Sequence, residues 1–210
     1  MVKRYLVLII LMINVNILMA QRTWFEIEVE KDIGDKLEVS FSPEIRFKEG
    51  MELNEYFFEP AVRYDFNDYF SLGANYRFGN NLNKDGESQW FGRYALDART
   101  GYEWQHLTAR FRMRFTNYED FGGDDDEREK YLRFRLKLDY EIKKIDLTPY
   151  VLSELYRSIT LKEFRKARWE GGMEYRINKF HDVGIYFRLN DYLYDKESVK
   201  IIGLTYKLSL

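Results

Sequence analysis

Residues 131–142 read YLRFRLKLDYEI, and their polarity alternates at every step. From Leu132 to Ile142 the even positions are apolar, whereas the odd positions from Arg133 to Glu141 are charged. A period of two places the two sets on opposite faces of a β-strand, whereas a helix would wind the charges around its axis. At about 3.3 Å per residue, eleven tilted residues cover roughly the hydrocarbon core of a bilayer. The stretch therefore predicts a strand with one face toward an apolar medium and the other toward water.

The same alternation recurs along most of the chain. No helical period appears after the first twenty residues, which predicts an all-β protein. Together with 131–142, the alternating segments are 25–30, 37–47, 55–66, 70–78, 93–104, 107–115, 147–157, 166–177, 183–190 and 199–210.

The connections between these segments alternate in length. Short turns are expected at residues 34–35, 67–68, 105–106, 143–144 and 178–179, and longer polar loops at 48–54, 79–89, 117–129, 157–165 and 190–197. Short turns at one end and long loops at the other are typical of antiparallel up-and-down barrels of the outer membrane. Aromatic residues near the strand ends would form interfacial girdles; they are Trp24, Tyr69, Trp90, Trp104, Tyr118, Trp169 and Tyr194.

The strand count is the least regular part of this pattern. One strand per segment gives eleven, whereas bacterial barrels usually have an even number. We therefore expect ten to twelve strands, with one strand split or missed within 50–66 or 156–164. Pro43, Pro60 and Pro149 also lie inside strand patterns, where each removes a ladder donor, so bulges or strand ends are expected there.

The N-terminus predicts export. Lys3 and Arg4 precede an apolar run from Tyr5 to Val15, and Ala20 offers a small residue at a cleavage site. This is the pattern of a secretory signal peptide, so residues 1–20 are expected to be the signal and residues 21–210 the barrel. A membrane-anchoring helix is the alternative, but the run is short for one.

Composition narrows the possible functions. The 210 residues contain no Cys, which excludes a disulfide framework, a thiol nucleophile and Cys-ligated zinc. Loss of Lys3 and Arg4 with the signal reduces the 33 basic residues to 31, against 35 acidic ones. This balance gives no indication of nucleic-acid binding.

Several stretches resemble a large family of Gram-negative outer-membrane β-barrels that is catalogued as a domain of unknown function. They occur in the family's order over almost the whole chain after the signal. They are SLGANYRFG (71–79), LTARFRMRF (107–115), YLRFRLKLDY (131–140), PYVLSELY (149–156), RWEGGMEYRINKFHDVGIYFR (168–188) and IIGLTYKLSL (201–210). The resemblance implies an outer-membrane barrel and brings no activity or catalytic residue with it.

If the apolar faces look outward, the charged faces line the lumen. Acids then gather on the first strands and bases on the sixth and seventh, on opposite walls of the barrel. The expected lumen charge network comprises Glu26, Glu28, Glu44, Arg46, Arg63, Arg77, Arg93, Asp97, Arg99, Glu103, Arg110, Arg112, Arg114, Arg133, Arg135, Lys137, Asp139, Glu141, Glu154, Arg168, Glu170, Glu174, Arg176 and Arg188.

Charges in a narrow lumen repel like neighbours strongly unless they are matched. We therefore expect the arginines of 110–114 and 133–135 to pair with carboxylates on neighbouring strands, including Asp97 and Glu154. A structural salt-bridge network is one hypothesis; a polar passage with a transverse field, or a small-molecule site, is the other. Under the first, Arg112→Ala strands a buried charge and costs several kcal/mol.

Two rival functions are less well supported. A lipid-modifying enzyme needs a Ser activated by a His, but His106 and His181 fall in predicted turns. The candidate serines are Ser40, Ser42 and Ser153, and none stands two residues from a histidine. A soluble periplasmic lipid-binding barrel would need the large apolar side chains inside instead.

The acidic loop from Tyr118 to Glu127 offers carboxylates, but not at the alternate positions of an EF-hand loop. We therefore expect no metal, no cofactor and no catalytic group. The sequence predicts a monomeric, porin-like outer-membrane barrel in contact with lipid. Its role would be structural or passive, as a small polar pore or a binding barrel for a small polar solute.

Overall fold

The computed structural model describes residues 20–82, 88–118, 129–194 and 197–210. Residues 1–19 of the predicted signal peptide lie outside this part of the chain, as do residues 119–127 of the acidic loop. Among the described residues, no helix is both long and apolar enough to cross a membrane.

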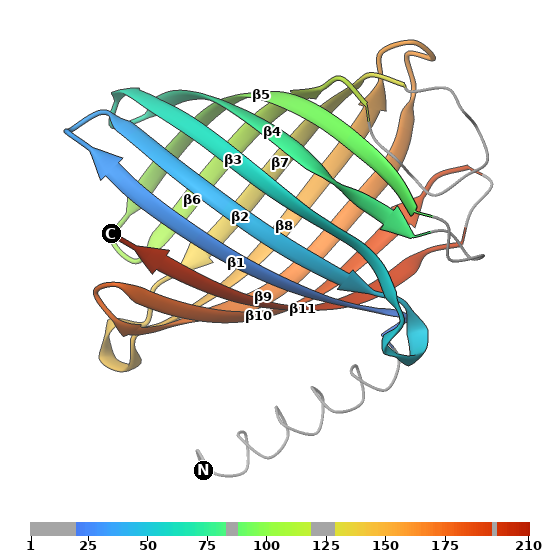
Figure 1. Cartoon of the computed structure of the whole chain (residues 1–210). Helices are drawn as coiled ribbons and strands as arrows, with labels where there is room; N and C mark the ends of the chain where they lie inside the picture. Colours follow the sequence, from blue (N-terminus) through green and yellow to red (C-terminus); the bar gives the residue numbers. More distant parts are fainter. Residues whose placement is uncertain (1–19, 83–87, 119–128, 195–196) are drawn as a thin grey trace.

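The described residues form eleven strands that close into one barrel (Figure 1). The strands are β1 (Arg22–Ile33), β2 (Leu37–Phe47), β3 (Leu53–Asn67), β4 (Phe70–Leu82), β5 (Ser88–Trp104), β6 (Leu107–Thr116), β7 (Tyr131–Tyr140), β8 (Leu147–Ser158), β9 (Phe164–Asn178), β10 (His181–Tyr192) and β11 (Val199–Ser209). Short 3-10 turns, η1 (Glu49–Met51) and η2 (Lys143–Ile145), lie in two of the connections. The all-β barrel of ten to twelve strands is confirmed.

Each strand pairs in antiparallel fashion with the next one along the chain, and the ring closes where β1 meets β11 in parallel. Trp24 pairs with Gly203 and Ile27 with Tyr206 along this seam. The expectation of a split or missed strand was wrong, because residues 53–67 form one strand and residues 159–163 are the connection from β8 to β9. An odd ring is possible because its first and last strands run in the same direction.

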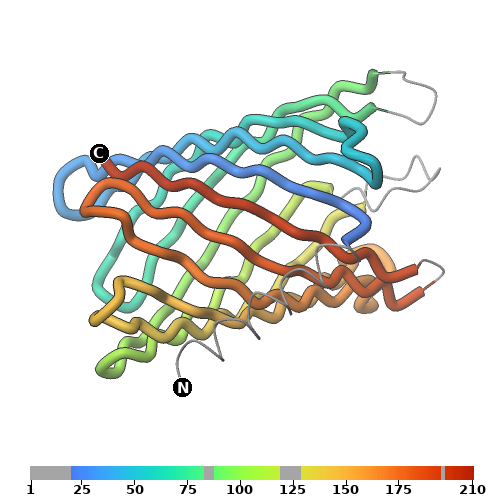
Figure 2. The backbone as a smooth tube through the Cα atoms, turned by 90° about the horizontal axis from the view of Figure 1, so that it is seen from below, coloured from blue at the N-terminus to red at the C-terminus, as the bar shows by residue number. Residues whose placement is uncertain are grey.

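The two ends of the barrel differ as the sequence predicts. The turns after β1, β3, β5 and β9 have two or three residues and lie at one end, together with the six-residue connection after β7 and the C-terminus (Figure 2). The other connections, of five to fourteen residues, lie at the opposite end. We call these the turn end and the loop end.

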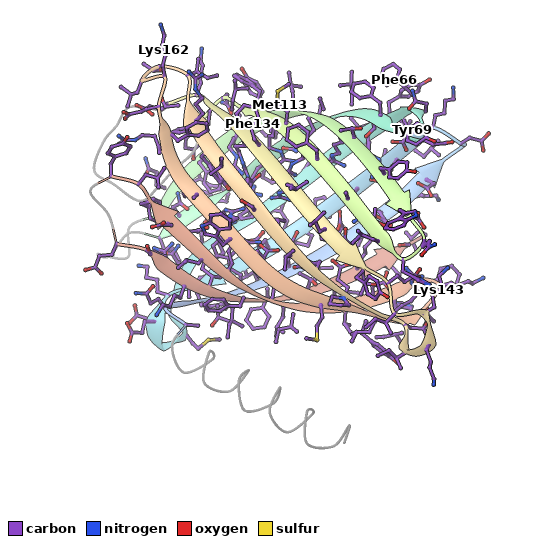
Figure 3. All side chains as sticks on the ribbon, turned by 180° about the vertical axis from the view of Figure 1, so that it is seen from behind. Phe66, Tyr69, Met113, Phe134, Lys143 and Lys162 are labelled. Atoms are coloured by element: carbon purple, nitrogen blue, oxygen red, sulfur yellow. The ribbon has the colours of Figure 1, made fainter. Side chains whose placement is uncertain are left out.

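The side chains of each strand alternate between the two surfaces of the barrel. On β7, Leu136 is 47% exposed, whereas Arg133 and Asp139 are each 4% exposed. Met113 and Phe134 face each other across β6 and β7 on the outer surface (Figure 3). The barrel therefore carries most of its large apolar side chains outside and most of its charges inside, which reverses the polarity of a water-soluble protein.

The prolines interrupt the ladders locally. Pairing of β1 with β2 stops between Glu26 and Val29, opposite Pro43, and pairing of β3 with β4 skips Pro60. Pro149 lies near the start of β8. A proline has no backbone N–H to donate, so a gap or a strand end accommodates it.

Two members of the predicted aromatic girdles are misplaced: Tyr118 lines the lumen, and Trp24 lies inside the barrel. Trp90, Trp104 and Trp169 are exposed on the outer surface, but Trp24 is buried. Its ring lies beneath the guanidinium of Arg46, at 3.8 Å from the ring centroid, inside the barrel. On β1 the even-numbered side chains point into the lumen, and Trp24 is one of them. The strand alternation therefore determines where its side chain points, although Trp24 lies near a strand end.

Candidate functional site: the charged lumen

A cavity of about 930 Å³ occupies the loop half of the lumen. Its lining reaches Arg22 at the start of β1, and it also includes Lys48, Leu82 and Tyr118, which lie in or beside connections at the loop end. Thirteen lining residues are basic: Arg22, Arg46, Lys48, Arg77, Arg93, Arg99, Arg112, Arg114, Arg133, Arg135, Lys166, Arg168 and Arg188. Five are acidic: Glu26, Glu28, Glu44, Glu55 and Glu59. We call these five residues, all on β1–β3, the acidic wall.

A second cavity of about 120 Å³ lies toward the turn end. Its carboxylates are Glu28, Glu30, Glu38 and Asp97. Five residues belong to the lining of both cavities: Glu28, Ser40, Ala61, Asn75 and Arg99. The two spaces therefore meet at one level of the lumen, where β1 to β5 contribute the junction.

The most deeply buried charge of the lumen is Glu154 on β8, which is 0% exposed. Its carboxylate lies 2.9 Å from Arg112, 3.0 Å from Arg133, 3.2 Å from Arg135 and 3.1 Å from Arg168. These four arginines come from β6, β7 and β9 and, with Glu154, form what we call the Glu154 cluster. One negative charge is thus shared among four positive ones.

Tyr156 contacts both the carboxylate and two of the arginines of the Glu154 cluster. Its hydroxyl donates to Glu154 at 3.0 Å, and Arg133 and Arg168 lie over its ring at 4.5 and 5.3 Å from the centroid. The negative face of an aromatic ring attracts cations. The ring therefore offsets part of the repulsion among the arginines.

Asp97 on β5 is a second carboxylate shared by arginines. Arg114 binds both of its oxygens, at 2.6 and 2.7 Å, and Arg99 lies 2.9 Å away. A two-bond arginine–carboxylate pair is strong and directional. Farther round the barrel, Glu170 pairs with Arg188 at 2.5 Å.

The ion pairs of the acidic wall involve three of its five carboxylates, and Glu59 also lies 3.9 Å from Arg114. Arg46 pairs with Glu44 at 2.6 Å and with Glu55 at 2.7 Å, and Arg77 pairs with Glu59 at 2.6 Å. Within the described part of the chain, Glu26 and Glu28 take part in no ion pair. This side of the lumen therefore holds more carboxylates than cations.

Other members of the expected network lie near the turn end. Lys137 pairs with Asp139 and Glu174, each at 2.9 Å, and Arg110 pairs with Asp139 at 3.0 Å. Arg63 pairs with Glu38, and Arg176 lies within 4.0 Å of Asp182 and Glu141. Arg110 and Arg176 are more than half exposed, so these pairs are weak.

Glu103 does not join the network. It is exposed next to the turn from β5 to β6 and forms no ion pair with any described residue. In contrast, Arg93 is buried on β5 and lines the large cavity, as expected from its position in the alternation.

Sequence reasoning left several lumen residues out of the expected network. Glu55, Glu59 and Lys166 line the large cavity, and Phe57 is buried beneath the guanidinium of Arg77. All four have the inward parity of their strands, so strict use of the alternation would have found them. Lys166, for example, stands two residues before Arg168.

The residues considered for an enzyme are not brought together. His181 begins β10, and its Nδ1 lies 2.6 Å from the hydroxyl of Tyr206. His106 lies in the turn before β6, while Ser40 and Ser42 line the lumen on β2. Among the described residues, no three His, Asp or Glu side chains are grouped as metal ligands would be.

Comparison with known proteins places the chain in a family. The model of the family described as "Protein of unknown function (DUF2490)" matches residues 21–198. The chain belongs to this DUF2490 family. The DUF2490 match begins one residue before β1 and ends one residue before β11, so it covers every strand that lines the large cavity; β11 adds Lys207 to the small one. No curated protein matches the chain.

Proposed function

We propose that the protein is a β-barrel of a Gram-negative outer membrane and that its lumen gives small polar solutes a narrow passage. The observation that carries the proposal is the reversed polarity of the barrel. Phe111, Met113 and Leu136 are each more than 40% exposed, whereas the inward side chains beside them are charged. Water does not favour such a surface, but the hydrocarbon of a bilayer does.

The strand geometry fits the same proposal. Every strand has at least ten residues, and nine to eleven tilted residues suffice to cross a bilayer. The closed ring leaves no unpaired strand edge in the hydrocarbon. The signal peptide expected at residues 1–20 would direct such a chain out of the cytoplasm.

The cavities favour a passage over a solid plug. The wide space at the loop end and the narrow one toward the turn end share five lining residues. A solute entering from the loop end would pass from the large cavity into the small one near Ser40 and Arg99. The lining is charged, so the apolar interior that a soluble lipid carrier needs is not found among the described residues.

Tryptophan quenching tests the membrane assignment. Two single-tryptophan variants of the barrel, one keeping Trp169 and one keeping Trp24, are refolded into vesicles of brominated lipid. We expect strong quenching of Trp169, which is exposed on the outer surface, and weak quenching of Trp24 in the lumen. Equal quenching of the two, or none of either, would contradict a membrane-spanning barrel.

Planar-bilayer conductance tests the passage. We expect small discrete conductance steps from the wild type and a lower conductance for Ser40→Trp, because Ser40 lines both cavities. Ser153→Trp is the matched control, since Ser153 pairs with Leu136 and Trp169 on the outer surface. A wild-type barrel that inserts without conducting would rule out the passage.

A further inference from the structure

Among the described residues, the lining of the large cavity is predominantly basic. Its thirteen basic lining residues face five acidic ones. Asp97, Glu154 and Glu170 lie behind the lining and pair with its arginines. Even with these three carboxylates, the acids counted among the described residues number eight and remain fewer than the thirteen bases. Charges of one sign in a confined space of low dielectric attract counter-ions strongly.

The surplus is greatest at the Glu154 cluster. Each arginine carries five N–H donors, whereas a single carboxylate offers two oxygens. All four arginines of the cluster line the large cavity, and the Arg135 side chain is 25% exposed. Nε of Arg112 is buried and has no hydrogen-bond partner among the described residues. The cluster thus holds more donors than Glu154 can accept.

We infer that the Glu154 cluster is a binding site for a small oxyanion, a solute that carries phosphate or carboxylate groups. Guanidinium groups bind the oxygens of both in pairs of hydrogen bonds. The cavity has the size of an ordinary ligand pocket. The inference rests on the proposed function, because the solute must reach the lumen from the loop end.

The acidic wall sharpens the specificity of this site. Glu26 and Glu28 stand on β1, on the opposite side of the barrel ring from β6 and β7. They offer an anion none of the N–H donors that the arginines supply, so the anion is expected to bind on the arginine side. A solute with an anionic group at one end would therefore orient across the lumen, with that group at the Glu154 cluster.

Thermal unfolding of the folded barrel in detergent tests the inference. Sodium phosphate and sodium citrate are titrated separately, and sodium chloride at equal ionic strength serves as the reference. We expect phosphate, citrate or both to raise the unfolding midpoint in a saturable way that chloride does not reproduce. A rise of equal size in chloride, or no rise in either oxyanion, would overturn the site.

Two variants locate the binding. Arg135→Gln removes one of four arginines and should weaken the apparent affinity about tenfold, the effect of one charge-assisted hydrogen bond. Arg176→Gln is the matched control and should leave the affinity unchanged, because Arg176 is exposed near the turn end and lines neither cavity. Both are first checked for a folded barrel by heat-dependent mobility on gels. A folded Arg135→Gln variant with wild-type affinity would also overturn the inference.

The failure of this inference is distinguishable from the failure of the proposed function. A barrel that conducts in bilayers but shows no saturable oxyanion effect refutes only the binding site. A barrel whose outer tryptophans stay unquenched by lipid refutes the membrane assignment, whatever its response to phosphate.

Discussion

The Glu154 cluster and the acidic wall solve the problem of buried charge in opposite ways. The cluster gathers four arginines on one carboxylate and covers it completely, so that Glu154 has no exposed surface. The acidic wall distributes five carboxylates along the side of an open cavity, where Arg46 and Arg77 pair with only three of them. Dense pairing supports structure, and the open side leaves space beside its carboxylates.

The difference indicates that the two sides of the lumen have different roles, one in stability and the other in solute passage. Strands β6 to β9 are tied together through a single side chain, while β1 to β3 leave room for a solute. The stability of the barrel should therefore depend on the cluster, and its permeability on the wall.

The largest expected effect is the loss of the shared carboxylate. Glu154→Gln leaves four arginines around a neutral amide, and breaking a buried charge network costs about 3–5 kcal/mol. Glu26→Gln is the matched change in the acidic wall and should alter stability by less than about 1 kcal/mol, because Glu26 has no ion pair within the described residues. Urea titration of the barrel folded into lipid vesicles measures both. Equal losses would remove the distinction between the two regions.

On the outer surface, a lysine should destabilise the barrel equally on β7 and on β1. Leu136→Lys on β7 and Ile27→Lys on β1 each place a charge midway along an outward-facing strand surface. Each should cost about 2–4 kcal/mol in lipid, because a lysine near the bilayer midplane is destabilising. Tyr140→Lys, at the end of β7, should cost about 1 kcal/mol or less. The same urea titration applies, and a midplane cost no larger than that at Tyr140 would contradict lipid exposure.

Two glycine substitutions inside the barrel should differ less in their effect on stability. A methyl group on Gly203 would overlap the ring of Tyr186, whereas one on Gly101 would lie 3.5 Å from its nearest neighbour, the carbonyl oxygen of Ala109. Gly203→Ala should therefore cost about 1–3 kcal/mol, the usual range for overpacking. Gly101→Ala should be near neutral. Thermal unfolding in detergent compares the two, and a neutral Gly203→Ala would show that the lumen beside β11 is loosely packed.

The smallest effect is expected at Arg112. Its removal leaves Glu154 paired with three arginines and takes away one like-charge neighbour. Arg112→Ala should therefore cost about 1 kcal/mol, not the several kcal/mol expected from the sequence for a simple buried pair. The free energies of unfolding of Arg112→Ala, Glu154→Gln and the double variant give the coupling free energy between the two side chains. A single-variant loss as large as that of Glu154→Gln would contradict the shared network.

The alternation of residues predicts which surface each strand residue faces, and therefore the closed barrel and its charged interior. It does not predict the height at which a side chain lies. Arg112, Arg135 and Arg168 converge on Glu154 because the registers of β6 to β9 bring them to one level. Register depends on turn geometry, which the sequence pattern specifies weakly. The position of Trp24 follows from parity, and the closure of β1 on β11 follows from counting the segments without forcing an even number.

The parallel seam between β1 and β11 has a consequence for the two ends of the chain. Because the ring is odd, a peptide fused ahead of Arg22 emerges beside the long connections, and one fused after Leu210 emerges beside the short turns. If the barrel crosses a bilayer, tags at the two fusion points are then accessible from opposite compartments. The contacts that fasten this seam, such as Ser209 to Glu30, join residues 179 positions apart. The barrel therefore cannot close until β11, its last strand, has been synthesised and has paired with β1.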